Sequence, residues 1–296
     1  MMRRTMQPGE EPLLESAPLA WRLAPQFCGK DPESDDNCSW YHRIWQFLRI
    51  MGLASSATQR REFYQQAVVE FLAGCDAPRI LIAGTADYAM LAQLLAVLRE
   101  RGPQASITVM DLCETPLHLN RWYAARLGWS IETMRSNLLD YAPPGAFDLV
   151  CTDSVLSRFE PSKWPALAAN WHALLRPAGI LVTSSRLRPD DGPGKIGFAS
   201  DQIVAFEQAV LSIATEKREL LGIDPRELAQ HAGLYARRQF NYPVRSLEQV
   251  ERLLGNAGFA FEQLTVAPKG TANREGIVAP TVPADSNWLR VIARRP

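Results

Sequence analysis

The residues best placed to do chemistry are Gly84, Asp111, Asn137 and Asp153, because each stands at or just beyond the end of a predicted short strand. The carboxyl ends of parallel strands meet at one edge of a sheet, and ligands bind there. Asp111 follows Gly84 by 27 residues. A carboxylate at that position offers two acceptor oxygens to the two hydroxyl donors of a ribose. The spacing therefore predicts a nucleoside-type ligand at this edge.

The elements that must position these residues alternate between strand and helix from residue 79 onwards. Helical patterns fill the intervals between strands, for example the leucines at helical spacing after Tyr88 and the stretch from Pro161 to Leu175. An alternation of this length predicts an α/β fold with a doubly wound, mostly parallel, seven-stranded sheet. The predicted strands are Arg79–Ala83, Ser106–Met110, Ile131–Arg135, Phe147–Thr152, 180–185, Phe259–Ala267 and Trp288–Arg294, with a loop at 270–286 between the last two.

The N-terminal quarter lies outside this alternation. Residues 1–38 are mostly irregular by pattern, and about the first 20 are expected to be loose, as chain termini usually are. Apolar residues at three- and four-residue steps then predict helices at Trp40–Leu53 and Thr58–Ala73. We expect residues 1–75 to form a tail and a helical cap, before a Rossmann-like domain at 76–296.

A second addition interrupts the domain at about 188–245. Its pattern predicts an amphipathic helix over Ala199–Leu221, a short helix from Asp224 to Gly233, and then an irregular stretch. The segment is too long for an ordinary connection, so we expect a functional insertion or lid.

Charge and hydropathy argue against several classes of partner. Lys+Arg and Asp+Glu both number 32, and nucleic-acid binders usually carry an excess of cations. No stretch approaches the ~18 apolar residues needed to span a bilayer, and the N-terminus lacks the apolar core of a signal peptide. We expect a soluble, cytosolic protein with no nucleic-acid or membrane partner.

The five cysteines give no familiar pattern. They include no CxxC pair, which argues against a zinc site or a disulfide framework, so no metal is expected. Cys75, Cys113 and Cys151 lie in or beside apolar runs and are predicted to be small core residues. Cys28 and Cys38 flank a polar loop, and are either redox-active or simply unpaired thiols.

Five motifs in order connect the chain to a known family. They are ILIAGTADY, ITVMDLCE, SNLLDY, FDLVCTDSVLSRF and LLRPAGILVTS. Over about residues 79–186 this order and spacing resembles the class I S-adenosylmethionine-dependent methyltransferases. Their pattern has a glycine-rich turn, a strand ending in an acid, an adenine-contacting segment, an F-D-x-[VI] strand and an L-[KR]-P-G-G turn.

The resemblance implies S-adenosyl-L-methionine as the cofactor and assigns residues to its parts. Asp111 would hold the ribose hydroxyls, Asn137 would face the adenine edge with Asp140 as a second candidate, and Asp153 would face the sulfonium and the substrate. Gly84 to Ala86 would lie against the methionyl part, and Leu112 beside the adenine. The cofactor-binding residues implied are Gly84, Thr85, Ala86, Asp111, Leu112, Asn137, Leu138 and Asp153.

Two departures from the family pattern stand out. The usual G-x-G-x-G turn is replaced by Gly84-Thr85-Ala86-Asp87-Tyr88, which puts a tyrosine where a glycine is usual. The LRPAG stretch has Ala178 at the first of two usual glycines. The first departure changes the pocket, and the turn would then do more than cradle the cofactor.

The implied reaction is in-line methyl transfer, in which positioning and the exclusion of water matter more than a strong base. Candidate bases or orienting groups are His42, Asp153, His231 and Tyr235, and Tyr88 in the turn is a further candidate. The aromatic run that includes Trp40, Tyr41, His42 and Trp45 either lines a substrate pocket or packs onto the core. Together with the inserted helices it favours a small-molecule acceptor with an N, O or S nucleophile.

Two other functions fit the same fold. One is an enzyme that catalyses a non-methylating reaction such as a cyclisation, and the other is a catalytically silent scaffold subunit. The stretch CTDSV after the fourth strand replaces an NPPY-like tetrapeptide. The absence of an NPPY-like tetrapeptide argues against an enzyme that methylates amides or adenine.

Overall fold

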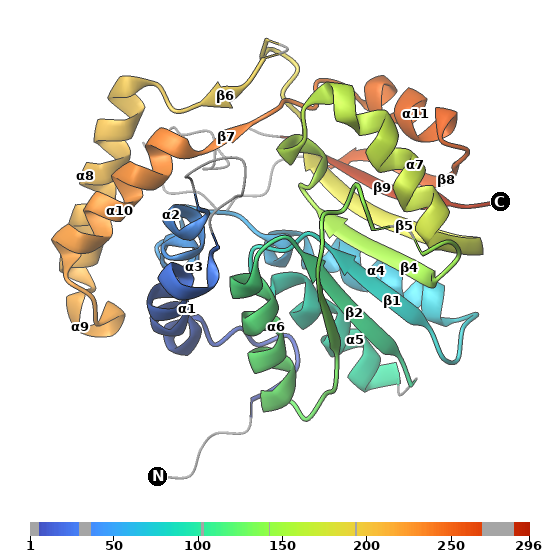
Figure 1. Ribbon diagram of the computed structural model, residues 1–296, viewed down its shortest axis with the longest axis horizontal. Helices are drawn as coiled ribbons and strands as arrows, with labels where there is room; N and C mark the ends of the chain where they lie inside the picture. Colours follow the sequence, from blue (N-terminus) through green and yellow to red (C-terminus); the bar gives the residue numbers. More distant parts are fainter. Residues whose placement is uncertain (1–5, 30–36, 102–103, 142, 193, 268–286) are drawn as a thin grey trace.

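The centre of the molecule is a seven-stranded sheet with the strand order β3-β2-β1-β4-β5-β9-β8 (Figure 1). The computed structural model describes residues 6–29, 37–101, 104–141, 143–192, 194–267 and 287–296. Strands β1 to β5 of this sheet are parallel, and β9 runs antiparallel to both β5 and β8. The strands are β1 Arg79–Ala83, β2 Ser106–Asp111, β3 Glu132–Arg135, β4 Phe147–Asp153, β5 Leu175–Arg186, β8 Ala260–Ala267 and β9 Trp288–Arg294. The predicted fold class is confirmed.

Helices cover both faces of the sheet, which explains why its central strands are continuously apolar. Each face of the sheet therefore has its own core. In β1, Ile80 and Ile82 pack into the first core, and Leu81 and Ala83 pack into the second. The first core is closed by α4 Arg61–Leu72, α5 Ala89–Arg101 and α6 Glu114–Arg126. The second is closed by α7 Trp164–Leu174 and α11 Leu247–Asn256.

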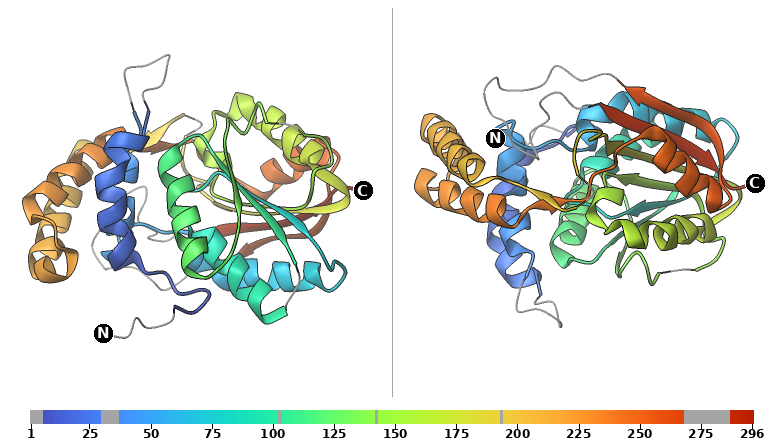
Figure 2. Two further views of the ribbon diagram at one scale, coloured as in Figure 1. Left: turned by 60° about the horizontal axis from the view of Figure 1, so that its bottom comes forward. Right: turned by 90° about the horizontal axis from the view of Figure 1, so that it is seen from above.

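A layer of helices beside the sheet joins the two additions to the domain (Figures 1 and 2). It combines α1 Leu13–Phe27, α2 Ser39–His42 and α3 Trp45–Ile50 with α8 Ser200–Glu216, α9 Arg218–Leu221 and α10 Pro225–Arg238. Buried residues of both sets form one apolar cluster. A short ribbon of β6 Ile196–Gly197 and β7 Phe240–Asn241 lies where the insertion leaves and rejoins the domain. The N-terminal extension and the insertion therefore build a third core together.

The expectation of a loose, irregular N-terminus is wrong for the described part. Residues 13–27 form α1, with Ala17, Ala20 and Trp21 buried on its inner face. Pro18 and Pro25 lie inside this helix and hid its periodicity. Small alanines on the buried face let α1 pack closely against its neighbours, so tertiary contacts outweigh the poor helix propensity of proline.

Two further predictions of helix bounds are wrong. The helix expected over Trp40–Leu53 is interrupted between α2 and α3. The helix expected to stop at Gly233 continues to Arg238, because Tyr235 and Ala236 are buried in the third core. Glycine at position 233 accommodates the close approach of the Glu207 side chain on α8.

The LRPAG stretch forms an irregularity inside β5. Leu175 pairs with Phe147 and Ile180 pairs with Leu149, so four residues of β5 face one residue of β4. Ala178 adopts φ +65° within this bulge, a left-handed conformation that favours glycine. The departure from the family pattern thus introduces local backbone strain.

The loop expected at 270–286 lies outside the described residues. Among the helices that the structure describes, none is both long enough and apolar enough to cross a membrane.

Candidate functional site

The Gly84 turn and Asp111 meet at the carboxyl edge of β1 and β2. Gly84 adopts φ +73°, and a Cβ at this position would lie 2.8 Å from Val155 Cγ2. The backbone N–H of Thr85 donates to Asp111 Oδ2 at 2.9 Å, and the N–H of Cys113 donates to Oδ1 at 2.8 Å. These bonds hold the carboxylate beside the turn.

Asp111 and Leu112 place a polar and an apolar group next to each other at this edge. Burial raises the pKa of Asp111 to about 6, against the opposing effects of His42 and of the two backbone N–H donors. The Leu112 side chain is 61 % exposed, which is unusual for a large apolar residue at the end of a central strand. A fixed carboxylate beside an exposed apolar side chain suits a ligand that carries both hydroxyl groups and a flat ring.

The segment after β3 lies at the same edge and is held by a residue that the sequence did not point to. Asn137 accepts the N–H of Leu139 at 3.0 Å through its side chain. Leu138 is buried in the second core, which leaves Asn137 and the backbone for contact with a ligand. The side chain of Asn170 on α7 donates to the carbonyl of Leu138 and, at 2.9 Å, to that of Tyr141. Asn170 lies about 30 residues further along the chain than this segment, so no local sequence pattern pointed to it.

Asp153, at the end of β4, is engaged by several donors. Arg60 contacts both carboxylate oxygens, with Nε to Oδ1 at 3.0 Å and Nη2 to Oδ2 at 2.5 Å. The hydroxyls of Tyr64 and Ser184 donate to Oδ1 at 2.8 and 2.7 Å. Arg60 also stacks on Trp288, with 3.6 Å between the guanidinium carbon and the ring centroid. These donors hold the Asp153 carboxylate in a fixed position.

Asp87, at a variable position of the turn, connects the turn to the N-terminal helices. Its Oδ1 accepts the N–H of Ala89 at the start of α5, at 3.0 Å. Its Oδ2 accepts from Trp45 Nε1 at 3.1 Å and from Arg49 Nη1 at 2.7 Å. Arg49 is 3 % exposed and also pairs with Glu11 at 2.7 Å. The turn is therefore linked to the N-terminal helices by a buried ion-pair network.

Tyr88 gives the turn a second link to the same helices. It is fully buried, its hydroxyl lies 2.7 Å from Ser16 Oγ on α1, and its ring stacks on Tyr123 of α6. Burial raises the pKa of this phenol, so the group stays neutral. The tyrosine in place of glycine thus packs against the N-terminal extension.

Aromatic side chains gather beside the turn. Tyr41 on α2 stacks on Trp45 of α3, with ring centroids 5.1 Å apart. Tyr235 of α10 is fully buried and lies 5.7 Å from Tyr41 and 6.0 Å from Trp40. Ala86 packs against the same cluster. The two additions to the domain therefore bring aromatic rings next to the predicted cofactor turn.

His231 lies among the helices of the additions. Its ring is 4.7 Å from Trp21 of α1, and its Nδ1 lies 3.1 Å from the carbonyl of Glu227. Burial lowers its pKa, which favours the neutral ring. Of the four candidate bases, His231 packs on α1, Tyr235 packs on α2, and Asp153 is paired with Arg60.

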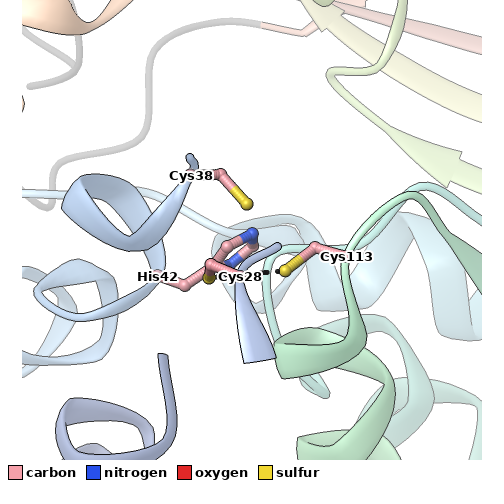
Figure 3. A group of neighbouring side chains, drawn as sticks. All are labelled: Cys28, Cys38, His42 and Cys113. Carbon is pink, nitrogen blue, oxygen red and sulfur yellow. Dashed lines mark hydrogen bonds between the residues drawn. The ribbon is translucent and has the colours of Figure 1, made fainter. Parts of the chain in front are cut away.

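His42, the fourth candidate, lies in a cluster with three cysteines (Figure 3). One ligand atom from each of Cys28, Cys38, His42 and Cys113 lies within 4.8 Å of the others. Hydrogen bonds with Cys28 and Cys38 hold the pKa of Cys113 well below its ordinary range. Cys113, expected to be an ordinary core residue, thus connects α6 with the N-terminal segment.

Comparison with known proteins agrees with this architecture. Residues 91–179 match the family model described as a methyltransferase domain. This match includes Asp111, Asn137 and Asp153 but begins after the Gly84 turn. Over these residues the match agrees with the resemblance that the sequence motifs indicate. No curated protein matches the chain by sequence.

Solved structures share the fold at low sequence identity. A putative sarcosine dimethylglycine methyltransferase from Galdieria sulphuraria is 11 % identical with a TM-score of 0.50, covering 95 % of this chain and 98 % of that one. The N-methyltransferase NodS from Bradyrhizobium japonicum, in complex with S-adenosyl-L-homocysteine, is 17 % identical with a TM-score of 0.49, covering 86 % and 98 %. At 11 % identity the likeness to the Galdieria sulphuraria structure shows the fold alone.

Proposed function

We propose that this chain is an S-adenosylmethionine-dependent methyltransferase that acts on a small-molecule acceptor. The observation that carries the proposal is the junction of the Gly84 turn with Asp111, whose carboxylate is fixed by the Thr85 N–H at 2.9 Å. This junction lies at the edge where doubly wound sheets bind nucleosides. The matched methyltransferase domain supports the same conclusion.

The residues at this edge fit the parts of the cofactor. Asp111 would accept hydrogen bonds from the ribose hydroxyls, and the exposed Leu112 would cover one face of the adenine. Asn137 and the backbone held by Asn170 would meet the adenine edge. Gly84, Thr85 and Ala86 would lie along the methionyl part, and the absence of a Cβ at position 84 leaves room for Val155 behind the turn.

When bound, S-adenosylmethionine would supply an electrophilic methyl group. The chain's own contribution would be to hold the acceptor in line with that methyl and to exclude water. The aromatic rings of α2, α3 and α10 beside Ala86 support an acceptor site that is small and partly apolar. No strong base is required for an amine, thiolate or phenolate nucleophile that arrives deprotonated.

Among the candidate bases, Asp153 serves best as an orienting group. Its ion pair with Arg60 and its hydrogen bonds from Tyr64 and Ser184 already engage the carboxylate oxygens and fix their position. His231 and Tyr235 would shape the wall of the acceptor site from α10.

The test is a calorimetric titration with S-adenosylmethionine, followed by mass spectrometry of reactions with small amines, phenols and thiols. The proposal expects one bound cofactor per chain and a product heavier by one methyl, together with S-adenosylhomocysteine. A converted acceptor without added methyl would instead indicate a non-methylating enzyme. Absence of binding at millimolar cofactor would favour a scaffold subunit and overturn the proposal.

A further inference from the structure

The side chains of Cys28, Cys38, His42 and Cys113 converge on one point between the N-terminal segment and the sheet domain (Figure 3). Cys28 follows the end of α1, Cys38 and His42 bracket α2, and Cys113 immediately precedes α6. Cys28, His42 and Cys113 are 4 %, 7 % and 5 % exposed. Four potential metal ligands from three separate segments thus share one buried volume.

The spacing of these atoms fits a tetrahedral zinc site. Four ligands at Zn–S distances of about 2.3 Å and Zn–N distances of about 2.0 Å have edges of roughly 3.5–3.8 Å. Cys28 Sγ and Cys113 Sγ lie 3.5 Å apart, and all four ligand atoms lie within 4.8 Å of one another. Small side-chain rotations would bring them onto one ion. A Cys₃His donor set is typical of closed structural zinc sites.

The His42 side chain favours a bound metal ion over simple packing of the three thiols. Among the described residues, His42 Nδ1 is a buried side-chain atom with no hydrogen-bond partner. The same ring lies beside the thiols of the cluster (Figure 3). Metal-bound histidines usually use one ring nitrogen for the metal and the other for a carbonyl or carboxylate. A buried ring nitrogen without a partner leaves His42 with an unused donor atom that a metal ion would engage.

A disulfide accounts for less of the cluster. It would join Cys28 to Cys113 and shorten their separation to about 2.05 Å. The third thiol and the unpartnered His42 nitrogen would then have no role. A zinc ion engages all four groups at once.

Neighbouring residues also contact the proposed zinc ligands. The N–H of Cys113 donates to Asp111 Oδ1 at 2.8 Å, and Cys28 Sγ lies 3.3 Å from Thr115 Oγ1. Cys113 stands at the N-terminus of the 13-residue helix α6, where the helix dipole favours a thiolate. The site is thus connected by one hydrogen bond to the predicted ribose-binding carboxylate.

We propose that Cys28, Cys38, His42 and Cys113 bind one structural Zn²⁺ that fastens the N-terminal helices to the sheet domain. On binding, the three thiols become thiolates and their protons pass to solvent, and no electron is transferred. The proposal replaces the expectation of no metal that followed from the absence of a CxxC pair. It also gives His42 a ligand role in place of that of a catalytic base.

The direct test is metal analysis of the full chain, purified under reducing conditions, followed by removal of metal and titration with Co²⁺. We expect one zinc per chain as isolated, and one Co²⁺ with the visible absorption of a tetrahedral thiolate site. Cys28→Ser and His42→Ala should each lose at least ten-fold in metal affinity. Cys75→Ser is the matched control, because this thiol lies outside the cluster, and it should retain full metal.

The wild-type titration keeps the proposal falsifiable even if a ligand variant fails to fold. A reduced wild-type chain that neither contains zinc nor gives the thiolate absorption with Co²⁺ would overturn it. So would a Cys28–Cys113 disulfide as the main form in non-reducing mass spectrometry. Neither result depends on binding of S-adenosylmethionine, so the proposal of a zinc site and the proposed function are tested independently.

Discussion

At the scale of single residues, contacts with the N-terminal helices explain the side chains that the Gly84 turn carries at positions 87 and 88. Asp87 accepts hydrogen bonds from Arg49 and Trp45, while Tyr88, where a glycine is usual, lies against Ser16. A turn that only cradled a cofactor would need neither side chain. If the turn holds the proposed cofactor, these residues connect cofactor binding with docking of the extension.

Arg49 is the residue on which this network depends most. Replacing it with methionine should lower the free energy of unfolding by about 3–5 kcal/mol, because Asp87 and Glu11 would be left as buried carboxylates without a cation. Chemical denaturation measures the change. The matched control is Arg237→Met, whose exposed pair with Glu207 should contribute less than about 1 kcal/mol. Equal effects of the two substitutions would show that the buried network is not stabilising.

Asn170 is expected to act on cofactor binding without touching the cofactor. Asn170→Asp keeps the size of the side chain but removes both amide donors to the segment after β3. We expect a loss of about 1–3 kcal/mol in stability, from the unsatisfied carbonyls. Affinity for S-adenosylhomocysteine should fall several-fold, because the adenine segment loses its support. An unchanged affinity in calorimetry would mean that the segment is held by other contacts.

At the scale of elements, the strands and their end residues could be predicted from the sequence because their signals are local. Apolar runs bounded by turn residues predicted the positions of β1, β2 and β4. The end of β2 then identified Asp111 as a candidate site residue. The helix α1 could not be predicted, because Pro18 and Pro25 contradict a helix until its alanine face is packed. Prolines within a helix are tolerated only when burial compensates for them.

The cysteine–histidine cluster was missed for a related reason. Its members stand at positions 28, 38, 42 and 113, and only the fold brings them together. The spacing of Cys38 and His42, four residues apart, was the one local signal that could have indicated a shared site. Likewise, Asn170 supports a segment that lies about 30 positions earlier in the chain, which no periodicity can reveal.

The bulge in β5 makes a prediction about stability. Ala178→Gly should raise the free energy of unfolding by about 0.5–1 kcal/mol, because alanine is strained at φ +65° and this position is exposed. Ala257→Gly is the opposite control, since Ala257 has helical angles with φ −82° and should lose stability on substitution. Thermal unfolding of both variants provides the measurement. Destabilisation by Ala178→Gly would contradict the assigned backbone strain.

At the scale of the whole molecule, the N-terminal extension and the insertion form a third core that closes over the edge of the sheet. Buried contacts from α1, α2 and α3 reach the Gly84 turn, and α8 and α10 pack on the same helices. Binding at the edge is therefore expected to depend on how firmly this layer is held. The proposed zinc ion lies at the boundary between the layer and the sheet.

Removal of metal should therefore destabilise the entire chain rather than one loop. An ion present at 100 times its dissociation constant stabilises the folded state by about 2.7 kcal/mol. Chelation under reducing conditions should lower the melting temperature of the wild type, and re-addition of Zn²⁺ should restore it. The Cys28→Ser variant should not respond to either treatment. If the chelator left the melting temperature of the wild type unchanged, metal would not be what holds this layer.

The central claim is that Asp111 holds the ribose of S-adenosylmethionine at the carboxyl edge of the sheet. Calorimetric titration of S-adenosylhomocysteine into the wild type and Asp111→Ala tests it most directly, with Asp201→Ala on the exposed start of α8 as the control. Loss of a charge-assisted hydrogen bond should weaken binding by at least ten-fold, about 1.4 kcal/mol. The control should bind as the wild type does. Equal affinity of wild type and Asp111→Ala, in a folded variant, would contradict the assignment of this site.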